Sequence, residues 1–319
     1  MKAAVVAFAL LAAMASVGAQ RDPIVTGTDG QVRGALLTVD KNVLYGMYSG
    51  LALLMDVYRP QRPNGFGVLQ INGAGWHSAM GYDAQPLKAG NVGDWRGALV
   101  GAGYTVFAIN TRQAPQFRYP AAVEDAQRAV RFVRVHATDF AVDPVRIGVV
   151  GQSAGGHLAL LLGTLDGDGV ADDSDPVNRQ SAKVQTVIAM AAPADFAHFT
   201  TSLGLSAVSS FLGIRIDRAY PAGSAEARIV RQASPVSHAT HDDAPVLLLH
   251  GDKDETVPFS QSELMQSALE QTGATVKLIG IVGGSHGFPA ETTKHPEWPN
   301  ITGEIIRWLD LHLKVKTVK

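Results

Sequence analysis

The five residues Gly151-Gln152-Ser153-Ala154-Gly155 constrain this chain more than any other stretch of it. An apolar, β-branched run at 145–150 precedes them, and an apolar, helix-like run at 157–162 follows. A tight turn between a strand and a helix has room only for small flanking residues, which these are. Such a turn lifts Ser153 above the sheet, at the positive end of the following helix. The stretch therefore predicts a strand–turn–helix unit with Ser153 as a candidate nucleophile.

The same G-x-S-x-G pattern occurs a second time, at 283–287. A plausible strand precedes it, but Phe288 and Pro289 follow, and no apolar helical run comes directly after them. Too little chain follows Ser285 to supply an acid and then a histidine in that order. We therefore interpret Ser285 as a loop residue that lies beside a candidate histidine, His286.

The partners of a serine nucleophile should follow it in the order acid, then histidine. Residues 245–250 are typical of a buried strand, and the turn after it contains Asp252 and Asp254. Both aspartates qualify as the acid, because open α/β sheets place their sites at the carboxyl ends of strands. His286 lies in a glycine-rich loop after the following strand, which suits an imidazole that must lean over the sheet. The order of the three loops predicts a Ser–acid–His site.

An acyl-transfer site also needs N–H donors for the negative charge that develops on the carbonyl oxygen. The amide of Ala154 is one candidate, because it follows the nucleophile directly. A predicted strand at 67–72 leads into the loop Gly73-Ala74-Gly75-Trp76, whose small residues let main-chain amides approach a tetrahedral intermediate. We expect this loop to supply the other donors, and Trp76, at its end, to border the substrate.

The alternation of apolar patterns predicts an α/β protein with a mostly parallel sheet covered on both faces. The predicted strands lie near 35–39, 51–58, 67–72, 104–109, 145–150, 185–191, 246–250 and 276–281. The predicted helices lie near 94–101, 121–137, 154–164, 259–272 and 300–314. Residues 196–231 interrupt this alternation of strands and helices. At this position, folds with such a sheet carry a cap over the site.

From about Leu53 to its C-terminus the chain resembles the α/β-hydrolase superfamily, on the side of the hormone-sensitive-lipase-like and acetylxylan/feruloyl-esterase-like (BD-FAE-like) esterases. The segments that carry the resemblance are 55–60, 72–76, 110–115, 119–125, 151–156, 233–235, 250–258 and 284–288. The resemblance implies the α/β-hydrolase fold, with a sheet of about eight strands flanked by helices and a small cap.

By this resemblance, Ser153 is the nucleophile, Asp254 the acid and His286 the general base. The family acid is the second aspartate of the pattern that begins at His250, which leaves Asp252 to brace the turn.

The family's usual His-Gly-Gly-Gly-Trp loop is changed here to Asn72-Gly73-Ala74-Gly75-Trp76. The asparagine can still brace the loop by hydrogen bonding, and Ala74 still has its N–H. The amides of Ala74 and Gly75, with that of Ala154, are therefore the implied oxyanion donors.

The implied function is that of a serine carboxylesterase for short-acyl or aryl esters, including acetyl or feruloyl esters of plant polysaccharide. The alternatives are an amide hydrolase on the same residues (an exopeptidase or an arylformamidase) and a non-catalytic binding protein on a hydrolase scaffold. The predicted reaction needs no cofactor and no metal. A formal charge of −2 with 18% charged residues shows no nucleic-acid footprint, so the expected partner is an ester substrate.

Residues 1–19 are typical of a signal peptide. Lys2 forms a short positive region, Ala3–Ala15 an apolar one, and small residues precede Gln20. The alternative is an anchoring helix, but the whole stretch without charges at 3–19, about 17 residues, is at the lower limit for spanning a membrane. We therefore expect a secreted or periplasmic protein whose residues 20–319 form one catalytic domain. With no cysteine, it has neither a disulfide nor a lipidated thiol.

The segment 165–183 is acidic, and its Asp166-x-Asp168 pattern is compatible with calcium. It lacks the glutamate of a full EF-hand loop. We interpret it as a solvated loop after the nucleophile helix, with calcium as the alternative.

Overall fold

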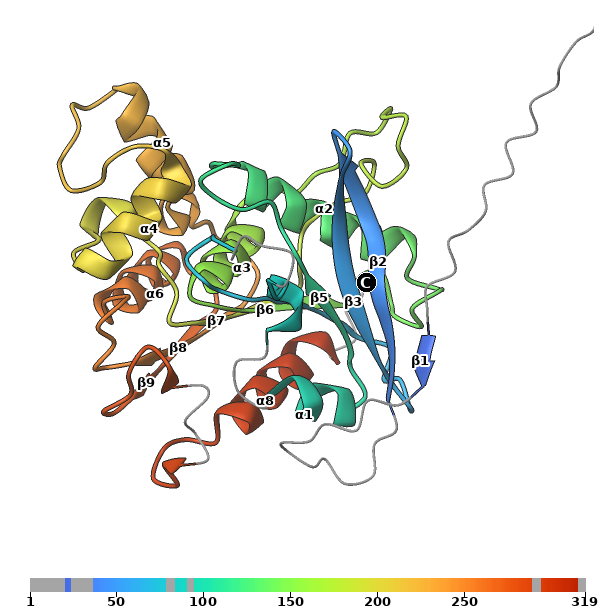
Figure 1. The fold of residues 1–319 in the computed structure, drawn as a ribbon. Helices are drawn as coiled ribbons and strands as arrows, with labels where there is room; N and C mark the ends of the chain where they lie inside the picture. The colour runs from blue at the N-terminus through green and yellow to red at the C-terminus, as the bar shows by residue number, and fades with distance from the viewer. Residues whose placement is uncertain (1–20, 24–36, 79–83, 91–94, 289–293, 315–319) are drawn as a thin grey trace, which may run out of the picture.

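The computed structural model describes residues 21–23, 37–78, 84–90, 95–288 and 294–314. The predicted signal peptide therefore lies outside the described residues. One nine-stranded sheet runs through the molecule in the order β1-β2-β3-β5-β4-β6-β7-β8-β9 (Figure 1). The strands are β1 (Arg21–Pro23), β2 (Leu37–Tyr48), β3 (Leu51–Pro60), β4 (Gly67–Ile71), β5 (Thr105–Ile109), β6 (Ile147–Gln152), β7 (Thr186–Met190), β8 (Val246–Gly251) and β9 (Val276–Ile281). The six strands from β5 to β9 in this order pair in parallel, and β1, β2 and β3 pair antiparallel.

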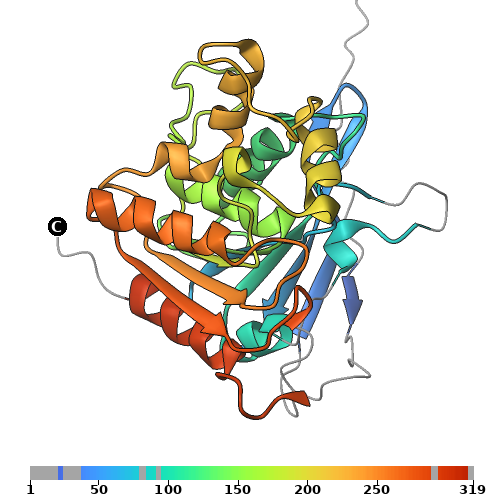
Figure 2. The same ribbon diagram turned by 90° about the vertical axis from the view of Figure 1, so that its left-hand side faces the viewer.

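Helices cover both faces of the sheet (Figures 1 and 2). The helices α1 and α8 lie on one face, and α2, α3 and α6 lie on the other. Their bounds are α1 (Trp95–Gly101), α2 (Ala121–Val135), α3 (Ala154–Thr164), α4 (Ser202–Leu212), α5 (Ala225–Ala233), α6 (Ser260–Thr272) and α8 (Ile301–Leu313), with short 3-10 turns η1 (Leu87–Ala89), η2 (Phe196–His198) and η3 (Pro235–His238).

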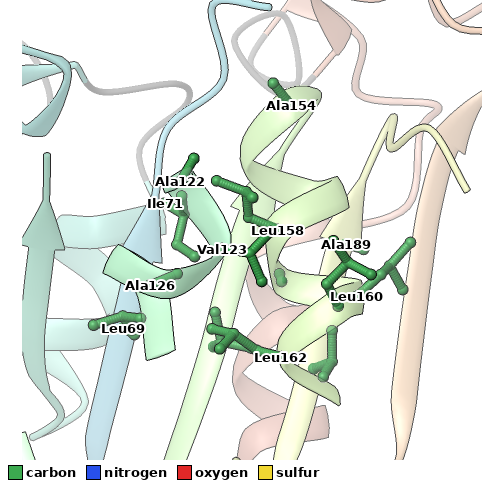
Figure 3. Close-up of a cluster of buried hydrophobic side chains, with 14 of the residues drawn as sticks. Leu69, Ile71, Ala122, Val123, Ala126, Ala154, Leu158, Leu160, Leu162 and Ala189 are labelled. Atoms are coloured by element: carbon green, nitrogen blue, oxygen red, sulfur yellow. The ribbon is translucent and has the colours of Figure 1, made fainter. Parts of the chain in front are cut away.

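The side chains of each central strand divide between two hydrophobic clusters, because successive residues of a strand point to opposite faces. On β4, Leu69 and Ile71 join the cluster under α2 and α3 (Figure 3), whereas Val68 joins the one under α1 and α8. All five residues of β4 are buried, as expected of a parallel strand covered on both sides.

The first long strand differs from its prediction. A strand was expected only near 35–39, but β2 continues to Tyr48 and pairs with β3 along its length. Ser49 and Gly50 join the two strands with positive φ angles of 46° and 85°, the conformation of a tight hairpin turn. The polar residues 40–42 and two register shifts break the alternation that would have marked the strand in the sequence.

Between β7 and β8 the chain leaves the sheet and forms η2, α4 and α5, which we call the cap. The cap lies on the same side of the sheet as α3 and α6 (Figure 2). In the part of the chain that the structure describes, no helix has the length and apolar character needed to cross a bilayer.

Helix α8 offers a test of this core. Leu309 is fully buried against the sheet, while Leu311 on the same helix is 57% exposed. We expect Leu309→Ala to lower the free energy of unfolding by about 2–5 kcal/mol, because it removes buried methyl groups and leaves a cavity. Leu311→Ala should change it by less than about 0.5 kcal/mol. Urea unfolding of both variants measures the difference, and equal losses would contradict this packing.

Candidate active site

The turn between β6 and α3 holds Ser153 in a backbone conformation that residues other than glycine rarely adopt, with φ 53° and ψ −125°. The chain passes so close to itself here that side chains are excluded. A Cβ added at Gly151 would lie 2.2 Å from the carbonyl oxygen of Gly155, and one at Gly155 would lie 2.1 Å from that of Ile71. The two glycines therefore permit the turn that raises Ser153 above the sheet.

Ser153, His286 and Asp254 form a continuous hydrogen-bonded row. The Ser153 Oγ lies 3.0 Å from His286 Nε2, and His286 Nδ1 lies 2.8 Å from Asp254 Oδ2. An ionised carboxylate only accepts, so His286 Nδ1 carries the proton and Nε2 is left to accept the serine hydroxyl. The structure thus brings together the three side chains that the sequence nominated, from three loops at the carboxyl edge of the sheet.

The carboxylate of Asp254 has no exposed side-chain surface and is fully hydrogen-bonded. Its Oδ1 accepts the backbone N–H groups of Thr256 and Val257, at 2.9 and 2.8 Å. Burial alone would raise the pKa of Asp254, but donors from His250, His286 and Val257 outweigh it and hold that pKa well below its usual range. Asp254 is therefore ionised at neutral pH.

Asp252, the other candidate acid, has a different task. Its Oδ1 accepts the N–H of Gly283 at 2.7 Å, which ties the turn after β8 to the loop that carries His286. Ser285, in the second G-x-S-x-G pattern, accepts the N–H of Gly287 at 3.2 Å and lies outside the row of three.

His250 is a site residue to which sequence reasoning gave no role. It is fully buried, and its Nε2 lies 3.0 Å from the carbonyl oxygen of Val257 and 3.2 Å from Asp254 Oδ2. Both partners are acceptors, so Nε2 carries the proton and Nδ1 accepts the hydroxyl of Ser262 at 2.7 Å. His250 thus donates a second imidazole hydrogen bond to the Asp254 carboxylate.

The loop after β4 comes within reach of Ser153. A Cβ at Gly73 would lie 2.9 Å from the Cβ of Ser153, so nothing larger than glycine fits there. Within the described residues, the N–H groups of Ala74, Gly75 and Ala154 donate to no other protein group. Unpaired amides beside a nucleophile are what a developing oxyanion requires.

The side chains of His77 and Asn72 connect this loop to neighbouring elements. His77 Nδ1 donates to the carbonyl of Gly75 at 2.5 Å, and its Nε2 accepts from Ser210 on α4 at 2.9 Å. Asn72 was expected to brace the loop itself, but its side-chain amide donates instead to the carbonyls of Leu87 and Gly90. The loop 72–76 is thereby joined both to the cap and to η1.

Trp76 was expected to border the substrate. It lines the cavity at Ser153, but only 4% of its surface is exposed. Its ring stacks on Phe211 with centroids 4.5 Å apart, and its N–H donates to Nδ1 of the buried His157 at 3.3 Å. Most of Trp76 therefore packs the cap against the body.

The cavity over Ser153 and His286 has a volume of about 370 Å³. The rest of its wall is mostly apolar, with Gln152 and Thr256 as the polar members, and part of it comes from α4 of the cap. The apolar residues are Pro193, Phe199, Gly204, Ala207, Val208 and Val257. Such a wall suits a small apolar group attached to the reacting carbonyl.

Two carboxylates of the acidic segment after α3 form ion pairs with basic side chains. Asp166 pairs with Lys183 at 3.2 Å, and Asp175 pairs with Arg128 at 2.8 Å. Across the described ranges, no three His, Cys, Asp or Glu side chains gather at a spacing that could hold a metal ion.

Comparison with known families agrees with this geometry. The BD-FAE family model matches residues 55–269, a span that includes the turn at Ser153, the loop 72–76 and Asp254. The chain belongs to the BD-FAE family. Because this match covers most of the chain, the resemblance stated from the sequence is confirmed.

Curated relatives of this BD-FAE protein include two from Mycobacterium tuberculosis (strain ATCC 25618 / H37Rv). The chain is 27% identical to "Esterase LipQ" over 231 residues, which is 71% of this chain and 51% of LipQ. It is 25% identical to "Esterase LipC" over 253 residues, 78% of this chain and 59% of LipC. The chain thus spans between half and three fifths of the length of these relatives.

Solved structures share the fold. A truncated carbohydrate esterase from gut microbiota superposes with a TM-score of 0.69 at 23% identity, covering 87% of this chain and 96% of that one. An esterase from Thermogutta terrifontis, Est2, gives 0.64 at 22% identity, covering 90% and 95%. The α/β-hydrolase fold expected from the sequence is therefore confirmed.

The buried His157 makes stability depend on pH. Burial lowers the pKa of His157 to about 4, so the folded state binds fewer protons than the unfolded state between pH 4 and 6.5. This contribution to stability is complete above pH 6.5 and is lost as the pH falls toward 4. We expect the free energy of unfolding to drop by about 3 kcal/mol more between pH 7 and pH 4 in the wild type than in His157→Gln, which cannot titrate. Urea titrations at both values measure this, and equal drops would contradict it.

Proposed function

We propose that this protein is a serine carboxylesterase that hydrolyses short-acyl or aryl esters through an acyl-enzyme on Ser153. The single observation that supports it best is the row of 3.0 and 2.8 Å contacts from Ser153 through His286 to Asp254, set beside unpaired amides. The names of the curated relatives, which are esterases, point the same way.

In the first half of the reaction, His286 Nε2 accepts the proton of Ser153 as Oγ attacks the ester carbonyl. Asp254 holds the tautomer of His286 and stabilises the imidazolium that forms. The amides of Ala74, Gly75 and Ala154 donate to the oxyanion, and each such donor typically lowers the barrier by about 3 kcal/mol. His286 then protonates the leaving alkoxide, and the alcohol departs.

In the second half, His286 removes a proton from a water molecule that attacks the acyl-enzyme carbonyl. The same amides stabilise the second tetrahedral intermediate. Its collapse breaks the bond to Ser153 Oγ, which takes the proton back from His286, and the acid product leaves.

An ester fits the cavity better than the substrates of an exopeptidase. An exopeptidase must hold a charged chain terminus, and an amino terminus calls for carboxylates. Among the described residues that line the cavity at Ser153, there is no carboxylate. The apolar wall therefore favours an uncharged acyl group.

The natural substrate is, on this proposal, an acetyl or feruloyl ester of plant polysaccharide outside the cell. Two structural neighbours are described as a carbohydrate esterase from gut microbiota and an acetyl ester-xyloside bifunctional hydrolase from Caldicellulosiruptor lactoaceticus. The signal-peptide pattern at 1–19 supports an extracellular substrate too.

Replacing the nucleophile tests the reaction itself. We expect the wild type to hydrolyse p-nitrophenyl acetate and to be labelled at Ser153 by a fluorophosphonate. Ser153→Ala should lower kcat by about ten-thousandfold or more, because no other group can form the acyl-enzyme. Ser285→Ala is the matched control and should keep most activity. A folded wild type that hydrolyses no ester and resists labelling would overturn the proposal.

Phe199 should set the acyl-chain limit. It lines both the 370 Å³ cavity at Ser153 and a separate cavity of about 740 Å³ inside the cap. Its ring packs closely against α4, since a Cβ added at Gly204 would be 2.1 Å from a ring carbon. We expect Phe199→Ala to join the two cavities and to raise the octanoate-to-acetate ratio of kcat/KM by about tenfold or more.

The control for this prediction is Leu205→Ala. Leu205 lines the cap cavity but not the cavity at Ser153. Its loss enlarges the cap cavity without opening the partition, so the chain-length preference should stay that of the wild type. The same shift in both variants would mean that Phe199 is not the partition.

A further inference from the structure

A buried chain of hydrogen bonds links the end of α5 to the loop after β4. His157 Nε2 lies 2.8 Å from the carbonyl oxygen of Ala233, the last residue of α5. The other ring nitrogen, Nδ1, lies 3.3 Å from Nε1 of Trp76. Trp76 directly follows Ala74 and Gly75, whose amides are the proposed oxyanion donors.

The partners of His157 determine which nitrogen carries its proton. A carbonyl oxygen only accepts, so Nε2 is protonated and donates to Ala233. The indole N–H of Trp76 only donates, so Nδ1 must be the unprotonated acceptor. His157 is fully buried, and burial keeps it neutral by lowering its pKa to about 4. This single tautomer therefore satisfies both neighbours, and either alternative leaves a buried polar group unpaired.

The loop that Trp76 ends is strained. Ala74, Gly75 and Trp76 have φ angles of 69°, 61° and 58°, three successive residues in the left-handed region. Two of the three carry a Cβ, for which this conformation costs roughly 1 kcal/mol or more each. Such a conformation persists only where the surroundings hold it, and Trp76 is the residue of the three whose side chain is anchored.

The anchors of Trp76 act from several directions. Its carbonyl accepts the N–H of Ala114 at 2.9 Å, its ring stacks on Phe211, and its ring N–H donates to His157. Stacking allows an aromatic ring to slide in its plane, whereas a hydrogen bond at the ring edge fixes its position. The contact with His157 is therefore the directional contact of the ring edge, and it acts on the loop together with the bonds from Ala114 and His77.

We propose that His157 is a positioning residue for the oxyanion hole, and that it acts through the indole N–H of Trp76. It touches neither the substrate nor the reacting atoms. It holds the amides of Ala74 and Gly75 at the place where the negative charge of the tetrahedral intermediate develops. The inference rests on the proposed serine-esterase function.

The role predicts a particular kinetic pattern. A displaced oxyanion hole weakens binding of the transition state and leaves binding of the neutral ester almost unchanged. We expect Trp76→Phe and His157→Leu each to lower kcat for p-nitrophenyl acetate by about 10- to 100-fold, with KM within about threefold of the wild type. The double variant should be no worse than either single one, because both changes break the same bond.

Two variants control for packing. His157→Gln should stay within about threefold of the wild-type kcat, because a glutamine amide can both accept from Trp76 and donate to Ala233. On α8, the buried indole N–H of Trp308 has no hydrogen-bond partner within the described residues. Trp308→Phe removes this N–H and should leave kcat unchanged. Trp76→Phe keeps the stacked ring, so the test stands even if His157→Leu does not fold.

A second readout separates positioning from general loss of structure. A short trifluoromethyl ketone adds to Ser153 and forms a hemiketal whose oxyanion occupies the hole. Its affinity for each variant should fall by the same factor as kcat/KM, while the melting temperature need not follow that order.

The outcomes separate this inference from the function on which it rests. Unchanged kcat in Trp76→Phe, losses that multiply in the double variant, or a His157→Gln as impaired as His157→Leu would each overturn the positioning role and leave the esterase intact. A wild type that neither hydrolyses esters nor reacts with a fluorophosphonate would overturn the function and this inference together.

Discussion

The close contact between α3 and the end of β4 is the constraint on which the site depends. At Gly155 the helix backbone lies so near the carbonyl of Ile71 that a Cβ would sit 2.1 Å from it. Ile71 is the last residue of the strand that leads into the oxyanion loop, and Gly155 is two residues after Ser153. One backbone contact therefore sets the distance between Ser153 and the loop that carries the proposed oxyanion donors, and any side chain at this point would widen it.

The row of Ser153, His286 and Asp254 combines a buried anion with a partly exposed base. The side chain of Asp254 is 0% exposed and that of His286 is 21% exposed. An isolated carboxylate at that depth would be protonated, but two backbone amides and two imidazoles donate to this one. The fold thus supplies a fixed negative charge on one side of His286 and leaves the other side open to substrate.

The sequence predicted the parts of the fold and site that local patterns encode. Ser153 and His286 lie in short glycine-rich turns next to apolar strands, so the order of turns along the chain was enough to nominate them. Asp254 needed the family resemblance, because Asp252 occupies the same turn. The roles of His157 and His250 were missed because they depend on partners that the fold supplies, such as the carbonyl of Ala233, 76 residues beyond His157.

In the proposed mechanism, the cap takes part in both substrate selection and transition-state stabilisation. Helix α4 forms a wall of the acyl cavity through Val208, and from the same helix Ser210 holds His77 against the carbonyl of Gly75. At the end of α5, Ala233 holds His157 and so Trp76. A shift of the cap that admits a longer acyl chain would also move the oxyanion loop. Widening the cavity by moving helices would therefore lower the reaction rate. Truncating a side chain such as Phe199 would not, because the truncation leaves these hydrogen bonds in place.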